Sequence, residues 1–350
     1  MSPEAGAGLG SSEFLTTPIP APSEASAVGG GAEPVRRVAL PHAEATAQPG
    51  PRPAHPGRAH VPGPPDRFEA DLGAVALVTD RGVAHARNED AVAAGVGIPA
   101  RGRAPVTVAV VCDGVSSSPN PQAASGTAAR TGVDACLSAL AEGRPVEDAA
   151  TAGLAAAAAA VRDIASIDGD SPSCTYVGAI VHDDGAGNAT ITVANVGDSR
   201  AYWLVPGDTG DDDAEPASRR LTLDDSWAQA LVDAGAMDEA AAMNDPRAHT
   251  LLRWLGADYD QQPWSSRSVQ SFRCTGPGVL LLCSDGLWNY LPDPVALAAI
   301  ATAKPPALAA RDLADYAVAC GGGDNITVAL VPVGALDPSE PAAPAVANGQ

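Results

Sequence analysis

The chain has 350 residues, of which 45% are hydrophobic, and a formal net charge of −21. It is therefore long enough for a large core and too acidic for nonspecific binding to nucleic acid or to anionic membranes. It has no apolar run of about eighteen residues that would span a membrane, and its first residues lack the basic and apolar regions of a signal peptide. These features predict a cytoplasmic protein.

The first 65 residues are predicted to be a disordered tail. They contain 13 of the 32 prolines and a single aromatic residue, Phe14. Such a composition cannot bury enough apolar surface to offset the entropy of ordering. Residues 336–350 have a similar composition and are predicted to form a short C-terminal tail. The folded domain is therefore predicted to span residues 66–335.

Within this domain, short apolar runs alternate with two alanine-rich helical segments. Val106–Gly114 is predicted to be a buried strand that ends in Asp-Gly, and helices are predicted over Pro121–Gly143 and from about Val146 to Ile167. A strand-rich part follows over residues 175–184, 188–205 and 268–286, and a helix and a strand end the domain. The spacing of the strands favours antiparallel sheets and an α+β fold of packed layers.

Residues 221–257 differ from the strands on either side. Their helical runs are broken at Gly235 and near Pro246, so they are predicted to be a helical insertion between strands.

Acidic residues recur at the ends of the predicted strands or in the turns beside them. They are Glu89, Asp90, Asp113, Asp285 and Asp324. Taken singly, Asp-Gly after a strand is ordinary turn chemistry. Converging carboxylates repel one another and have raised pKa values unless cations lie among them. Oxygen ligands in such number suit Mg²⁺ or Mn²⁺.

Taken in this order, and with the sequence VANVGDSRAYWL between them, these motifs resemble the metal-dependent protein phosphatases, the PPM or type 2C serine/threonine phosphatases, of the bacterial type. The resemblance covers about Ala74 to Val333. It implies a β-sandwich of two antiparallel sheets flanked by helices, with two Mn²⁺ or Mg²⁺ ions, or three, at one end. It also implies that the insertion at 221–257 is the flap beside the active site.

The resemblance assigns roles to individual residues. Asp90 would form a hydrogen bond to a metal-bound water and would be catalytic together with Asp113, while Asp198 would help Asp285 to hold a third ion. The implied metal ligands are Glu89, Asp113, the Gly114 carbonyl, Asp198, Asp285 and Asp324.

The activity implied is that of an enzyme, a serine/threonine phosphoprotein phosphatase that hydrolyses phosphate monoesters through a water bridging two cations. Its partners would be phosphoserine or phosphothreonine proteins in bacterial signalling, where it would counteract a kinase. Neither a zinc site nor a disulfide framework is predicted, because the six cysteines show no paired spacing.

Two departures from the family pattern keep an alternative open. His85 lies where members of the family usually carry an arginine that grips phosphate, and Arg87 is the candidate to replace it. Ser116 to Ser118 replace glycines and are predicted to cap the following helix. The alternative is a catalytically weak or inactive phosphatase-like module that binds or regulates.

Overall fold

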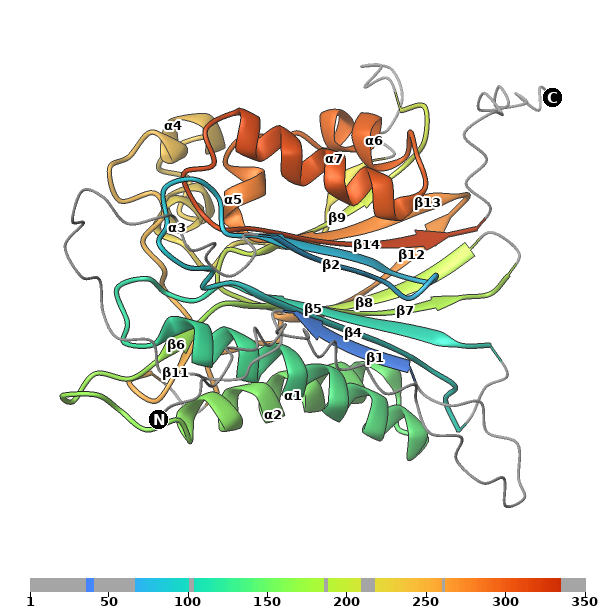
Figure 1. Cartoon of the computed structure of the whole chain (residues 1–350), viewed down its shortest axis with the longest axis horizontal. Helices are drawn as coiled ribbons and strands as arrows, with labels where there is room; N and C mark the ends of the chain where they lie inside the picture. The colour runs from blue at the N-terminus through green and yellow to red at the C-terminus, as the bar shows by residue number, and fades with distance from the viewer. Residues whose placement is uncertain are drawn as a thin grey trace, which may run out of the picture. The chain divides into compact units, whose positions relative to one another are not determined.

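Two six-stranded antiparallel sheets stack face to face, and helices cover their outer faces (Figure 1). The structure is a computed structural model that describes residues 36–40, 67–100, 104–185, 188–208, 218–259 and 262–334. All of these residues belong to one compact unit, Glu33–Gln350.

The first sheet is formed, in spatial order, by β1 (Arg36–Leu40), β4 (Ala91–Gly97), β5 (Val106–Cys112), β7 (Tyr176–Asp183), β8 (Asn188–Val196) and β12 (Val269–Thr275). The second sheet is formed by β10 (Arg219–Arg220), β9 (Arg200–Leu204), β13 (Gly278–Cys283), β14 (Ile326–Val333), β3 (Ala76–Asp80) and β2 (Arg67–Asp71). A small separate sheet joins β6 (Ser173–Cys174) to β11 (Leu255–Gly256).

Two long helices, α1 (Pro121–Ala141) and α2 (Val146–Arg162), lie on the first sheet. The second sheet is covered by α6 (Pro294–Ala301), α7 (Pro306–Ala319) and the short α5 (Asp285–Trp288). The layers therefore follow the order helix, sheet, sheet, helix (Figure 1). The predicted α+β sandwich is confirmed.

Three apolar clusters hold these layers together, and strand β13 contributes to two of them. Leu280 and Leu282 pack between the sheets, whereas Val279 and Leu281 pack against α6 and α7. Successive side chains of a strand point to opposite faces, and here both faces are covered. A continuous apolar run is the pattern that such burial requires.

Residues 188–205 were expected as one strand-rich stretch, and they form two strands in different sheets. The chain leaves the first sheet after β8 and enters the second at β9. Gly197 makes this turn with a φ of 102°, a conformation that glycine adopts without strain. The turn that connects the two sheets therefore contains Asp198.

The insertion contains two short helices, α3 (Trp227–Asp233) and α4 (Glu239–Met243). Each begins with a side-chain cap, because Ser226 accepts a hydrogen bond from the Gln229 amide and Asp238 accepts one from the Ala241 amide. The helices predicted for residues 221–257 are therefore present, but they are short.

One segment of the predicted N-terminal tail is a strand, so the prediction of disorder was wrong for Arg36–Leu40. This segment is β1, and it pairs with β4 along its whole length. Leu40 is buried between the sheets. The RRVAL sequence has a β-branched and an aliphatic residue in alternate positions, which suits an edge strand. The other residues of the predicted tails lie outside the described residues.

Candidate metal centre

The acidic residues predicted for the site lie at one end of the sandwich, because antiparallel neighbours begin and end at the same edge. In the first sheet, Ala91 at the start of β4 pairs with Cys112 at the end of β5. Glu89 and Asp90 directly precede β4, and Asp113 directly follows β5.

The second sheet brings the remaining acids to this same end. Cys283 at the end of β13 pairs with Arg200 at the start of β9 and with Val328 in β14. The residues that flank these pairs on the side of the site are Asp198, Asp285 and Asp324.

Asp90 is the most deeply buried of these acids, with 1% of its surface exposed. Its Oδ2 atom accepts hydrogen bonds from the hydroxyls of Ser284 and Thr327, both at 2.7 Å. Its Oδ1 atom is buried without a hydrogen-bond partner. One carboxylate oxygen is thus held in place, while the other keeps its capacity to accept a proton or a ligand.

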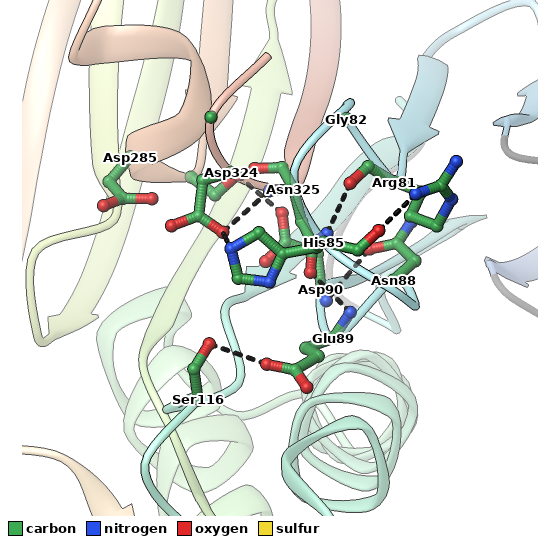
Figure 2. A network of polar contacts seen from close by, with 12 residues as sticks. Arg81, Gly82, His85, Asn88, Glu89, Asp90, Ser116, Asp285, Asp324 and Asn325 are labelled. Atoms are coloured by element: carbon green, nitrogen blue, oxygen red, sulfur yellow. Dashed lines mark hydrogen bonds and ion pairs between the residues drawn. The ribbon is translucent and has the colours of Figure 1, made fainter. Parts of the chain in front are cut away.

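Glu89 is held on both of its carboxylate oxygens. Arg87 Nε donates to Oε1 at 2.8 Å. The Ser116 hydroxyl donates to Oε2 at 2.7 Å (Figure 2). Gly114 approaches the backbone of Glu89 so closely that a Cβ there would lie 2.6 Å from the Glu89 carbonyl oxygen. The structure therefore places the backbone of Gly114 against the backbone of Glu89.

His85 and Asp324 face each other across the opening of the site. The distance from His85 Nε2 to Asp324 Oδ1 is 3.1 Å (Figure 2). Arg81 donates a hydrogen bond to the His85 carbonyl, and the Asn325 side chain donates to the carbonyls of Arg81 and Arg87 at 2.7 and 3.1 Å. The loop that carries His85 is thereby fastened to the residue after Asp324.

Asp285 is the first residue of α5, so it begins a helical turn directly after strand β13. Asn289 donates to its Oδ2 at 3.2 Å, and its Oδ1 is buried without a partner. A Cβ at the next residue, Gly286, would lie 2.0 Å from the Asn325 carbonyl oxygen. Glycine at this position is what lets Asp285 and Asp324 approach each other.

No protein-family model matches the sequence. A serine/threonine phosphatase stp of Listeria welshimeri is 36% identical over 141 residues, which are 40% of this chain and 51% of that protein. The serine/threonine protein phosphatase PstP of Mycobacterium tuberculosis is 29% identical over 262 residues, 73% of this chain and 44% of that protein. The chain thus spans about half the length of the curated relatives it matches.

Among solved structures, the PPM Ser-Thr phosphatase MsPP of Mycobacterium smegmatis, in complex with cacodylate, superimposes with a TM-score of 0.55. The match covers 76% of this chain and 100% of MsPP, at 26% identity. The chain is thus similar in sequence and in fold to the PPM phosphatases.

The carboxylates of the candidate site repel one another and are largely shielded from solvent. Burial, and then the charges of neighbouring acids, raise the pKa values of Asp113 and Asp198 above the usual range. Burial and the charge of Asp324 raise the pKa of Asp285 to about 6, although hydrogen bonds from Asp113 and Asn289 oppose the rise. Burial raises the pKa of Asp90 to about 8.

These features fit divalent cations. Carboxylate oxygens are the ligands that Mg²⁺ and Mn²⁺ prefer, and two buried oxygens, Asp90 Oδ1 and Asp285 Oδ1, lack any hydrogen-bond partner. A cation among these groups would favour their charged forms and reverse the rise in pKa. The candidate site therefore has the donor set for metal ions.

We expect the metal-free chain to lose thermal stability as the pH rises. Asp90 and Asp285 bind protons more tightly in the folded state than in the unfolded state. Their protonation therefore makes its full contribution to the free energy of unfolding below about pH 4. It is lost as the pH passes about 6 for Asp285 and about 8 for Asp90. Melting temperatures measured in EDTA from pH 5 to pH 9 should fall by on the order of 5 °C. Saturating Mn²⁺ should abolish the fall, and an identical slope with Mn²⁺ would contradict the assignment.

Some residues of the candidate site could not be found from the sequence. Ser284 and Thr327 orient Asp90, but a serine or threonine at a strand end carries no distinctive signal. His249 lies in the insertion, beside Asp198 and Asp285, and no motif surrounds it. Ser116 was expected to cap the next helix, and this was wrong. The N-cap residue of α1 is Asn120, its side chain forms no capping hydrogen bond, and the Ser116 hydroxyl donates to Glu89 instead.

Proposed function

We propose that this chain is a metal-dependent serine/threonine phosphoprotein phosphatase whose phosphatase domain spans residues 66–335 together with strand β1 (Arg36–Leu40). The observation that supports this most strongly is the gathering of buried carboxylates at one end of the sandwich. Such an arrangement is unfavourable unless cations are present. The named activities of the relatives agree with this proposal.

The proposed cofactors are two Mn²⁺ or Mg²⁺ ions, or three. When bound, such ions polarise a phosphoryl oxygen and lower the pKa of water. The residues proposed to hold them are Glu89, Asp113, the Gly114 carbonyl, Asp198, Asp285 and Asp324.

The protein's own residues have distinct roles in this proposal. Ser284 and Thr327 fix Asp90 through Oδ2, so that Oδ1 is left to orient a water molecule and to accept its proton. Arg87 and Ser116 hold Glu89 in one rotamer. Carboxylates that are held in place by hydrogen bonds in this way need less reorganisation during the reaction.

The phosphate of the substrate is proposed to enter beside His85 and Arg87. Both side chains are partly exposed at the opening, at 26% and 57%. In place of the usual arginine, however, His85 is paired with Asp324, and Arg87 is paired with Glu89. These pairings support the alternative of a weak or inactive phosphatase-like module, which the experiments below distinguish.

The proposed partners are phosphoserine and phosphothreonine proteins, in opposition to a kinase of a bacterial signalling system in the cytoplasm. Among the described residues, no helix combines the length and apolar character needed to cross a bilayer. Binding to nucleic acid or to a membrane is not part of the proposal, since the chain carries a net charge of −21.

The direct test is the initial rate of hydrolysis of a phosphothreonine peptide by the full-length chain. We expect turnover with Mn²⁺, none in EDTA, and recovery when Mn²⁺ is restored, because the carboxylates need a cation to act. Phosphate release measured by a colorimetric assay suffices. A folded protein that binds Mn²⁺ but releases no phosphate would favour the inactive module.

We expect His85→Arg to lower the KM for phosphate esters by about three- to tenfold. A guanidinium makes a charge-assisted fork to phosphate that an imidazole cannot make. The control is His85→Gln, which removes the pair with Asp324 without supplying a cation and should not lower KM. An unchanged KM in His85→Arg would mean that Arg87 already contacts the phosphate.

A further inference from the structure

A cavity of about 420 Å³ lies between the insertion and the first sheet. Its volume is within the range of sites that bind small ligands. One wall is formed by α3, on which Gln229, Ala230 and Asp233 share a face, and the opposite wall includes Asn195 of β8 and Gln270 of β12. None of the proposed metal ligands is among its lining residues. The cavity is therefore a second candidate site, separate from the metal centre.

Asn195 gives this cavity a buried hydrogen-bond acceptor. The residue is 6% exposed, and its Nδ2 atom donates to the carbonyls of Gly197 and Leu223 at 3.4 and 3.2 Å. These two acceptors fix the orientation of the amide, because Oδ1 could not take the place of Nδ2. Among the described residues, Asn195 Oδ1 has no hydrogen-bond partner. A ligand that carries a donor would satisfy it.

Asp225 adds a carboxylate at the same end of the cavity, since its Oδ2 atom accepts a hydrogen bond from the Gly197 amide at 3.3 Å. Arg253 Nη1 lies 2.6 Å from Asp225 Oδ1, and the two side chains are 41% and 14% exposed. Burial raises the pKa of Asp225, although Arg253 opposes the rise. A further cationic group beside this carboxylate would stabilise its charged form. This end of the cavity therefore suits an ammonium group.

The other end of α3 carries an exposed ion pair. Both terminal nitrogens of Arg267 lie 3.3 Å from Asp233 Oδ2, and these side chains are 58% and 43% exposed. Such a pair contributes little to stability, so a ligand anion can replace Asp233 as the partner of Arg267 at little cost. Leu223 and Leu252 also line the cavity and are 46% and 39% exposed. They offer apolar contacts to a ligand that connects the two ends.

We propose that this cavity binds a short peptide of about three residues, with its ammonium group at Asn195 and Asp225 and its carboxylate at Arg267. The two ends are separated by the length of α3, roughly 10 Å, and three extended residues span about the same distance. A purely anionic ligand would be repelled by Asp225 and Asp233, and a purely cationic one by Arg253 and Arg267, whereas a zwitterion matches both ends. The inference goes beyond the proposed function and does not depend on it.

The test is isothermal titration calorimetry of the full-length chain with the tripeptide Ala-Leu-Ala, in EDTA and without any phosphate ester. We expect N-acetylation of the peptide to weaken binding about tenfold or more, because the ammonium group then loses its charge-assisted hydrogen bonds at the buried end. Amidation of the carboxylate should weaken binding only about threefold, because Arg267 is exposed.

Two variants assign the ends of the peptide to the ends of the cavity. Arg267→Met should weaken binding of the free tripeptide about threefold and should leave binding of the amidated tripeptide unchanged. Asp225→Asn should reduce the preference for the free over the acetylated tripeptide about threefold or more. Arg273→Met, at an exposed position of β12 outside the cavity, is the matched control and should bind as wild type does.

Three results would overturn the inference. They are no binding of Ala-Leu-Ala to the folded wild-type chain, equal affinity for the free and the doubly blocked tripeptide, and equal effects of Arg267→Met and Arg273→Met. Loss of phosphatase activity has no bearing on these measurements, and a chain that lacks activity can still bind the peptide. Failure of the two proposals is therefore distinguishable.

Hydrogen exchange provides a second readout, at the turn that both Asn195 and Asp225 contact. The Asp225 amide donates to the Gly197 carbonyl at 2.8 Å, and the Gly197 amide donates to Asp225. Both amides should exchange about threefold or more slowly when Ala-Leu-Ala is bound, because the peptide orders the side chains that hold this turn. Unchanged exchange at a saturating concentration of the tripeptide would place it outside this cavity and overturn the inference.

Discussion

Asp113→Asn should lower kcat/KM for a phosphothreonine peptide by at least about a thousandfold, or ~4 kcal/mol in the barrier. The pKa of Asp113 is raised first by burial and then by the charges of Asp90, Asp285, Asp198 and Asp324, so Asp113 is electrostatically linked to the other aspartates of the cluster. An amide at this position supplies no charge to hold a cation. The measurement is the initial rate across a range of Mn²⁺ concentrations.

The same variant should remain folded, and it should be more stable than wild type in EDTA at neutral pH. The replacement removes a carboxyl group whose ionised form is unfavourable when it is buried among other acids. Repulsion among the acids of the metal-free protein is therefore reduced. Urea unfolding in EDTA measures this. Asp312→Asn, on the exposed side of α7, is the matched control and should change neither property. Retention of a tenth of the wild-type rate by Asp113→Asn would refute the metal assignment.

Arg200→Met should lower the free energy of unfolding by about 3–5 kcal/mol. Arg200 and Asp224 form a buried ion pair, with 3% and 4% of their side chains exposed, and Arg200 Nη2 lies 2.7 Å from Asp224 Oδ2. The guanidinium also lies 3.6 Å from the ring centroid of Trp288. Removing the arginine leaves Asp224 charged and buried without a partner. The measurement is urea unfolding in EDTA, so that metal binding does not contribute.

Two comparisons isolate the cause of this loss. Arg200→Met combined with Asp224→Leu should recover most of it, because the unpaired charge is then absent. Arg267→Met breaks a pair with Asp233 that is 58% and 43% exposed, and it should cost less than about 1 kcal/mol. Equal losses from the buried and the exposed pair would contradict this account.

The fold and the edge at which the acids meet were predictable because both follow from local patterns. A continuous apolar run such as Val279–Cys283 indicates a strand with both faces covered. In antiparallel sheets, acids at the end of one strand and at the start of the next lie together, so Asp113 and Glu89 were expected at the same edge. These inferences need no knowledge of how distant side chains pack.

The residues that were missed depend on tertiary contacts. RRVAL lies in a proline-rich segment, and it becomes a strand only because the edge of β4 offers partners for its backbone. Ser116 was read as a helix cap because sequence reveals the adjacent helix but does not reveal the carboxylate of Glu89. His249 is separated from Asp198 by fifty residues of sequence, and only the fold of the insertion brings them together.

The pairing of β1 with β4 has a consequence for any shortened form of the chain. A chain that starts at residue 66 would leave the amides and carbonyls of β4 that face β1 unpaired, at the edge of the first sheet. Unprotected borders of this kind recruit strands from other molecules and promote aggregation. It would also uncover the apolar surface beneath Leu40. We therefore expect strand β1, although it lies in a proline-rich part of the sequence, to protect the sandwich against self-association.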